Sequence, residues 1–268
     1  STMNPNISEF SYGYTVTEET IQAGPPLKVA PLFPSLIGEG KVGYDVFLDR
    51  PGLPLFLQFK LSHCMVRNNA KEIRFGYFPA GTRFYRMYLR PRGKSRQHKL
   101  LLALESRGNV VKYVAPLFHE PYELNDAYAT NEVTRRSIFV SPSWVGPLPD
   151  DRSHHIAFDT SGARYFLSEP EPPEHARTIE EDISFSALVD EMVLRVREQG
   201  DRPLRAQAGS LVDHLIEILS QQPPPYGLGL DRVKEQRQQI EPLRLAGYLS
   251  RTYFDCELLL IGLAEHHP

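Results

Sequence analysis

Asp45, Gln58 and Lys60 are side chains whose types suit metal-assisted hydrolysis of a phosphodiester bond. A carboxylate and an amide carbonyl are hard oxygen ligands of the kind that Mg²⁺ prefers, and Mg²⁺ keeps water molecules of its own, one of which can act as the nucleophile. A lysine beside the ion can activate a bound water or stabilise negative charge in the transition state. We therefore treat these residues as a candidate catalytic group.

Two predicted strands position this group. The stretch 38–63 contains β-branched and aromatic residues on both sides of the turn sequence Arg50-Pro51-Gly52. Residues two apart on a strand point to the same face, so Gln58 and Lys60 project together, and a hairpin can bring Asp45 beside them. Because an unpaired ammonium is costly to bury, we expect Asp45 to be the partner of Lys60.

Asp45, a short spacer and then Gln58-Phe59-Lys60 resemble the PD-(D/E)XK nuclease superfamily in its Gln-x-Lys variant, as in Mrr-like restriction endonucleases. The resemblance covers roughly residues 10–120 and rests on a short motif. It implies an endonuclease that uses Mg²⁺, with Mn²⁺ as a substitute, to cleave nucleic acid, and DNA is favoured by analogy. Asp45 would bind the ion, Gln58 would offer it an oxygen or position a water, and Lys60 would act on the nucleophile or the transition state.

A second acid is needed because position 58 carries an amide where the commoner family member has a carboxylate. Glu39, flanked by glycines close to the first strand, is our first choice as the additional metal ligand. Glu18 and Glu19, in a helix predicted around residues 17–23, are alternatives. An acid there is equally explained by the favourable interaction of a carboxylate with a helix N-terminus.

A basic and aromatic segment follows the Gln-x-Lys strand. No acidic residue occurs between Ile73 and Leu104, whereas arginines and lysines alternate there with phenylalanines and tyrosines. This composition is typical of a surface that holds phosphates electrostatically and stacks on bases or sugars. The predicted nucleic-acid contacts are Arg83, Arg86, Arg90, Arg92, Lys94, Arg96 and Lys99. A solvated basic strand with its aromatic side chains turned inward is the alternative.

The segment after residue 92 predicts a helix to Ser106, stopped by Gly108, and then a strand at 110–116. The family resemblance suggests that this helix packs over the site and can present a polar residue to it. Gln97 lies in the first turn of the helix. We nevertheless expect Gln97 to be solvated at the surface.

Length and composition indicate a globular protein of more than one domain. The chain has 268 residues, more than the usual single domain of about 100–200. We predict an α/β protein with a restriction-endonuclease-like mixed sheet core flanked by helices at residues 1–168, a linker at 169–177 and an all-helical C-terminal domain at 178–268. Its last predicted helix begins at Pro242 and carries Leu258, Leu259 and Ile261.

The chain contains no run of about 18 apolar residues, and its two cysteines give neither a disulfide framework nor a zinc motif. We therefore expect a cytoplasmic protein without membrane contact. The C-terminal helices are candidates for homo-oligomer formation or for docking a partner protein.

Two other interpretations remain open. Asp45 and Lys60 can form a cross-strand ion pair on an ordinary hairpin, with no catalytic role. Alternatively, the chain is a non-catalytic subunit that binds nucleic acid or assembles a larger machine, and Gln58 marks a lost metal site. A role in prokaryotic defence against foreign DNA is a further hypothesis, which rests on the family resemblance alone.

Overall fold

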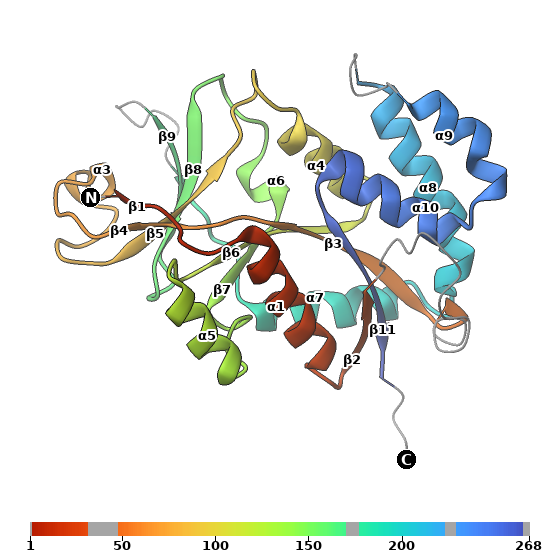
Figure 1. Cartoon of the computed structure of the whole chain (residues 1–268), viewed down its shortest axis with the longest axis horizontal. Coiled ribbons are helices and arrows are strands. Elements are labelled where there is room, and N and C mark those ends of the chain that lie inside the picture. Colours follow the sequence, from red (N-terminus) through yellow and green to blue (C-terminus); the bar gives the residue numbers. More distant parts are fainter. Residues whose placement is uncertain (1, 32–47, 170–176, 223–228, 265–268) are drawn as a thin grey trace. The chain divides into compact units, whose positions relative to one another are not determined.

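The computed structural model describes residues 2–31, 48–169, 177–222 and 229–264 (Figure 1). The chain is a mixed α/β protein that divides into two compact units. Unit 1 comprises Ser1–Glu19, Phe59–His98 and Lys112–Ala187, and unit 2 comprises Thr20–Gln58, Lys99–Val111 and Leu188–Pro268. Because each unit is assembled from separate stretches, the predicted division into residues 1–168 and 178–268 differs from the one observed.

An antiparallel six-stranded sheet forms most of unit 1, with the strand order β1-β4-β5-β8-β9-β10. The strands are β1 (Thr2–Met3), β4 (His63–Met65), β5 (Phe84–Leu89), β8 (Ser153–Phe158), β9 (Arg164–Glu169) and β10 (Arg177–Thr178). Figure 1 shows β5, β8 and β9 side by side. The short runs at 156–158 and 163–167 predict this hairpin of β8 and β9 from the sequence.

The turn between β8 and β9 is fixed by Asp159. Its Oδ1 accepts hydrogen bonds from the backbone N–H groups of Ser161, at 2.9 Å, and Ala163, at 3.1 Å. Gly162 has a φ of 91°, which a residue with a Cβ adopts at a cost in energy. Such a side-chain contact with nearby backbone is typical of aspartate in turns.

Beside this sheet, apolar side chains of unit 1 form a core cluster. Phe78 and Phe84 stack with their ring centroids 4.5 Å apart. The buried members are Met65, Ala70, Phe78, Phe84, Ala157 and Leu167. The aromatic residues of the basic segment are therefore used partly as core, as the alternative interpretation of that segment expects.

Unit 1 also contains all or most of the paired strands β6 (Val110–Pro116) and β7 (Ser137–Val140) and of several helices. The helices are α1 (Glu9–Gln22), α3 (Lys71–Arg74), α5 (Pro121–Ala129) and α6 (Pro142–Val145). β6 has the predicted bounds, whereas α1 begins well before the predicted helix at 17–23. Ser8 Oγ accepts a hydrogen bond from the N–H of Ser11, at 2.9 Å, and this contact stabilises the early start of α1.

In unit 2, three antiparallel strands are ordered β2-β11-β3, with β11 in the middle. They are β2 (Leu27–Pro31), β3 (Gly52–Phe59) and β11 (Glu257–Leu263). A Cβ at Gly52 would lie 2.4 Å from the carbonyl oxygen of Ile261, so only glycine allows β3 to approach β11 this closely.

The helices of unit 2 come from two parts of the sequence. α4 (Gln97–Ser106) and α7 (Phe185–Glu198) enter unit 2 from unit 1, and the later helices are α8 (Leu204–Ser220), α9 (Leu230–Gln236) and α10 (Pro242–Leu249). A 3₁₀ turn (Arg237–Gln239) and a π-helical turn (Ser250–Phe254) complete the set. The predicted helix start at Pro242 agrees with the start of α10.

The prediction of an all-helical C-terminal domain is wrong. Leu258, Leu259 and Ile261 lie in β11, and each is at most 2% exposed. A strand that is buried on both faces carries a continuous apolar run, which periodicity cannot distinguish from a buried helix. The start of the predicted helical domain at residue 178 is also wrong, since Thr178 belongs to β10 and α7 begins at Phe185.

Candidate active site

Two of the predicted carboxylates, Asp45 and Glu39, lie outside the residues that the structure describes. The described part of the candidate site therefore consists of Gln58, Lys60 and the side chains that hold them. Gln58 belongs to unit 2 and Lys60 to unit 1, so the two environments are described separately.

Gln58 lies near the end of β3 and is fully buried, with 0% exposure. Its Nε2 donates a hydrogen bond to Oδ2 of Asp255, at 3.3 Å. Because the amide nitrogen makes this bond, the carbonyl oxygen is the end of the side chain that could face a cation.

Asp255 is an exposed carboxylate between the π-helical turn and β11. Its φ is 55°, in the left-handed region that aspartate and asparagine tolerate better than other non-glycine residues. Unusual backbone of this kind and π-helical turns are both frequent at functional sites. Asp255 is thus a candidate ligand or orienting group that the sequence analysis missed, because it is 197 residues from Gln58 and no motif marks it.

Lys60 follows the last residue of β3 and is 8% exposed. Its backbone N–H donates to the carbonyl oxygen of Val114 in β6, at 2.8 Å, which fixes the start of the side chain. Its Nζ donates a hydrogen bond to Oε1 of Gln97, at 3.0 Å. The ammonium is therefore held inside unit 1 by a neutral amide from the first residue of α4.

The expectation that Gln97 is solvated is wrong. The residue is 6% exposed and its side chain faces Lys60. The helix that follows the lysine strand thus presents a polar residue to the candidate catalytic lysine, as the family resemblance suggests. The physical reason is the cost of burying an ammonium without a hydrogen-bond acceptor.

Arg86 belongs to the predicted nucleic-acid contacts, but its guanidinium is used inside unit 1. Its side chain donates to both carboxylate oxygens of Glu72, each at 2.6 Å, and both residues are buried. His155 Nε2 lies 2.9 Å from Glu72 Oε1. Burial alone would raise the pKa of Glu72, but the hydrogen bonds from His155 and Arg86 outweigh it and lower the pKa to about 2. We therefore remove Arg86 from the proposed contacts with phosphate.

Arg83 is half exposed but has several partners. Its guanidinium donates to Oε1 of Glu123, at 2.8 Å, lies 2.9 Å from Nδ1 of His119, and contacts the sulfur of Cys64 at 3.1 Å. A phosphate would have to compete with Glu123 for this group. This competition makes Arg83 a weaker candidate for a phosphate contact than an arginine without a carboxylate partner.

The remaining predicted contacts lie at or near the surface. Arg92 pairs with Asp151 at 2.9 Å, and both side chains are more than half exposed. Exposed pairs of this kind contribute little to stability, so Arg92 can exchange its partner at small cost. Arg90, Lys94 and Lys99 are exposed and Arg96 is half buried. Lys99 belongs to unit 2 and the others to unit 1.

Glu18 and Glu19, the candidate acids in α1, have structural partners in unit 1. Glu19 is 7% exposed and accepts hydrogen bonds from the backbone N–H groups of Val133, at 2.9 Å, and Thr134, at 2.7 Å. Glu18 accepts a hydrogen bond from the hydroxyl of Tyr128, at 2.8 Å. These contacts favour a structural role over metal binding, and Glu39 remains the preferred second acid among the sequence candidates.

No protein-family model matches the chain, and neither the curated proteins nor the solved structures contain a match to it. Across the described residues, every helix is too short or too polar to cross a membrane. The described residues also contain no group of three or more histidine, cysteine, aspartate or glutamate side chains that could hold a metal ion.

Proposed function

We propose that this chain is a magnesium-dependent endonuclease that hydrolyses phosphodiester bonds in nucleic acid, with DNA favoured by family analogy. The observation that carries the proposal is the buried ammonium of Lys60, hydrogen-bonded to Gln97. Keeping a charge in the interior costs folding free energy, so a fold that retains one is a candidate for a functional site. A fixed ammonium is also well suited to stabilise negative charge that develops on a phosphate.

The proposed oxygen donors are of the kinds that Mg²⁺ prefers. Mg²⁺ retains several waters and needs only one or two carboxylates from the protein. Asp45, Glu39 and Gln58 are the proposed ligands, and Asp255, which accepts a hydrogen bond from Gln58, would bind the ion or orient the Gln58 amide. When bound, the ion would polarise the phosphate and activate a water.

The side chains of the protein would then have separate tasks. Gln97 fixes the position of the Lys60 ammonium, which stabilises the charge on the phosphate in the transition state. Arg90, Arg92, Lys94, Arg96 and Lys99 are the proposed contacts to the nucleic-acid backbone, with a smaller contribution from Arg83. Contacts to phosphates carry little sequence information, so they do not define a recognition sequence.

The direct test is nicking of a supercoiled plasmid by the full chain. We expect cleavage with Mg²⁺ or Mn²⁺, none with a chelator, and none with Asp45→Ala. Binding that is unaffected by chelator, with no nicking under any condition, would instead identify the chain as a non-catalytic binding or assembly subunit. Cleavage at the wild-type rate by Asp45→Ala would refute the proposed ligand set.

Asp255 gives a second test of the ion site. Asp255→Asn preserves the tolerance for a positive φ and the ability to accept a hydrogen bond from Gln58 but removes the negative charge. We expect the Mg²⁺ concentration for half-maximal nicking to rise about tenfold or more, with the unfolding free energy changed by less than about 0.5 kcal/mol.

Asp231→Asn is the matched control for this test, because Asp231 is 93% exposed on α9. It should leave the Mg²⁺ requirement unchanged. If Asp255→Asn behaves like this control, Asp255 has no part in ion binding.

The proposed setting is a prokaryotic cytoplasm, where such an enzyme would act against foreign DNA. This setting rests on the family resemblance. Assembly through the C-terminal helices, as a homo-oligomer or with another protein, also stays a prediction. Exposed apolar side chains on these helices, such as Leu194 and Tyr248, are compatible with it.

A further inference from the structure

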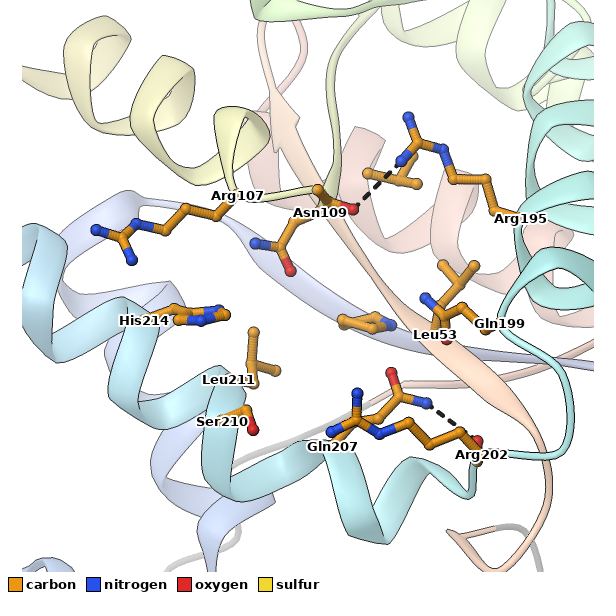
Figure 2. Close-up of a pocket in the computed structure, with 13 residues that line it drawn as sticks. Leu53, Arg107, Asn109, Arg195, Gln199, Arg202, Gln207, Ser210, Leu211 and His214 are labelled. Atoms are coloured by element: carbon orange, nitrogen blue, oxygen red, sulfur yellow. Dashed lines mark hydrogen bonds between the residues drawn. The ribbon is translucent and has the colours of Figure 1, made fainter.

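Unit 2 contains a pocket with a volume of about 170 Å³. Most of the residues that line it are far in sequence from the Gln-x-Lys motif. Figure 2 shows it between the start of β3, the end of α4 and the loop after it, the end of α7, and α8. Its lining includes Arg107, Asn109, Arg195, Arg202 and Gln207. The volume is below the roughly 300–1,000 Å³ of sites that enclose drug-sized ligands, so a small group would fit.

The charges that line the pocket have one sign. Three of the lining residues are arginines and none is an aspartate or glutamate. Arg107 is paired with Glu217 through two hydrogen bonds, of 2.8 and 2.7 Å. Arg195 lies 3.3 Å from Glu191 and donates to the carbonyl oxygen of Gly108, also at 3.3 Å.

Arg202 differs from these two arginines. Within the part of the chain that the structure describes, no carboxylate pairs with its guanidinium. In Figure 2 the guanidinium of Arg202 extends along the pocket toward Ser210, whereas that of Arg107 turns toward α8. A guanidinium that no carboxylate of the described residues contacts, with its planar set of donors, is suited to a phosphate.

Two of the three amide side chains that line the pocket, those of Asn109 and Gln207, present acceptors instead of donors. Asn109 Nδ2 donates to the carbonyl oxygen of Leu104, at 2.9 Å, and Gln207 Nε2 donates to those of Gly52, at 2.8 Å, and Arg202, at 3.1 Å. With the nitrogens occupied, the carbonyl oxygens of Asn109 and Gln207 face the pocket (Figure 2). Such oxygens repel an anion but accept hydrogen bonds from hydroxyl groups.

The pocket therefore combines a cationic group for an anion with nearby acceptors for hydroxyls. A bare anion would satisfy Arg202 only, and a neutral polyol would satisfy the amide oxygens only. We propose that the pocket binds a sugar phosphate, whose phosphate contacts Arg202 and whose hydroxyl groups donate to Asn109 and Gln207. This ligand class is independent of the proposed nuclease activity, since none of the proposed catalytic residues lines the pocket.

Calorimetric titration of the full chain with ribose 5-phosphate tests the assignment, at constant ionic strength and without nucleic acid. We expect a dissociation constant of about 1 mM or tighter. Inorganic phosphate and ribose alone should each bind at least about tenfold more weakly, because each lacks one set of contacts.

Arg202→Ala should weaken binding of ribose 5-phosphate at least about tenfold, the loss expected for a charge-assisted hydrogen bond. Arg232→Ala is the matched control, because Arg232 is an exposed arginine on α9 outside the pocket, and it should bind like the wild type. The proposal is overturned if ribose 5-phosphate does not bind, if inorganic phosphate binds as tightly, or if both variants bind like the wild type.

Discussion

Replacing Lys60 by methionine should slow magnesium-dependent nicking of a supercoiled plasmid at least about 100-fold, the usual consequence of removing one group that stabilises transition-state charge. Methionine keeps much of the length and apolar character of the lysine stem, so the change removes the ammonium with little loss of packing. The rate constant for nicking at saturating Mg²⁺ is the quantity to measure. The retained fold is checked by the unfolding transition of the variant.

Lys234→Met is the control for Lys60, since Lys234 is an exposed lysine on α9 with no part in the proposed site. We expect its nicking rate and its binding to nucleic acid to stay close to wild type. An arginine at position 60 is not conservative, because its planar group cannot replace an ammonium at the same point. Wild-type nicking by Lys60→Met would remove the lysine from the proposed mechanism.

Glu72→Ala should lower the free energy of unfolding by about 3–5 kcal/mol, because it leaves the buried guanidinium of Arg86 without its carboxylate. Chemical denaturation at neutral pH measures this change. The control is Arg92→Ala, which breaks the exposed arginine–carboxylate pair of Arg92 and Asp151. The side chains of Arg92 and Asp151 are 57% and 66% exposed. We expect that control to change the unfolding free energy by at most about 1 kcal/mol.

The same carboxylate makes stability depend on pH at the acidic end. The pKa of Glu72 is about 2 in the folded protein and 4.5 in a model peptide. A group whose pKa is lowered by folding contributes stability that is complete above its unfolded pKa and is lost as the pH falls toward its folded pKa. The stability difference between wild type and Glu72→Gln should therefore shrink between pH 4.5 and pH 2. A difference that stays constant over this range would contradict the assigned pKa.

Local sequence patterns were sufficient for several elements. The bounds of β6 follow from a run of apolar and aromatic residues, and α10 begins at the predicted Pro242 because proline fits the first turn of a helix. β11 was mistaken for a helix because its burial on both sides removes the alternation that identifies a strand. The pairing of β11 with the distant strands β2 and β3 makes this segment a strand, and that pairing cannot be read from a single sequence.

The candidate site shows the same limit. The motif Gln58-Phe59-Lys60 identifies Gln58 and Lys60 as candidates, and the structure shows that both side chains are buried. Their partners are 37 residues away for Lys60 and 197 for Gln58, so Gln97 and Asp255 become visible only once the chain is folded. The composition of residues 73–104 likewise identifies a basic segment. It does not show that the charge of Arg86 is neutralised by Glu72 of α3.

The position of β11 between β2 and β3 also bears on how the chain is made. A ribosome releases β2 and β3 long before it reaches β11, and until then their facing backbone groups have no partner strand. Such edges are prone to pair with other chains. Unit 2 can close its sheet only at a late stage of synthesis, so this interval is when the nascent polypeptide is most exposed to aggregation and most dependent on chaperones.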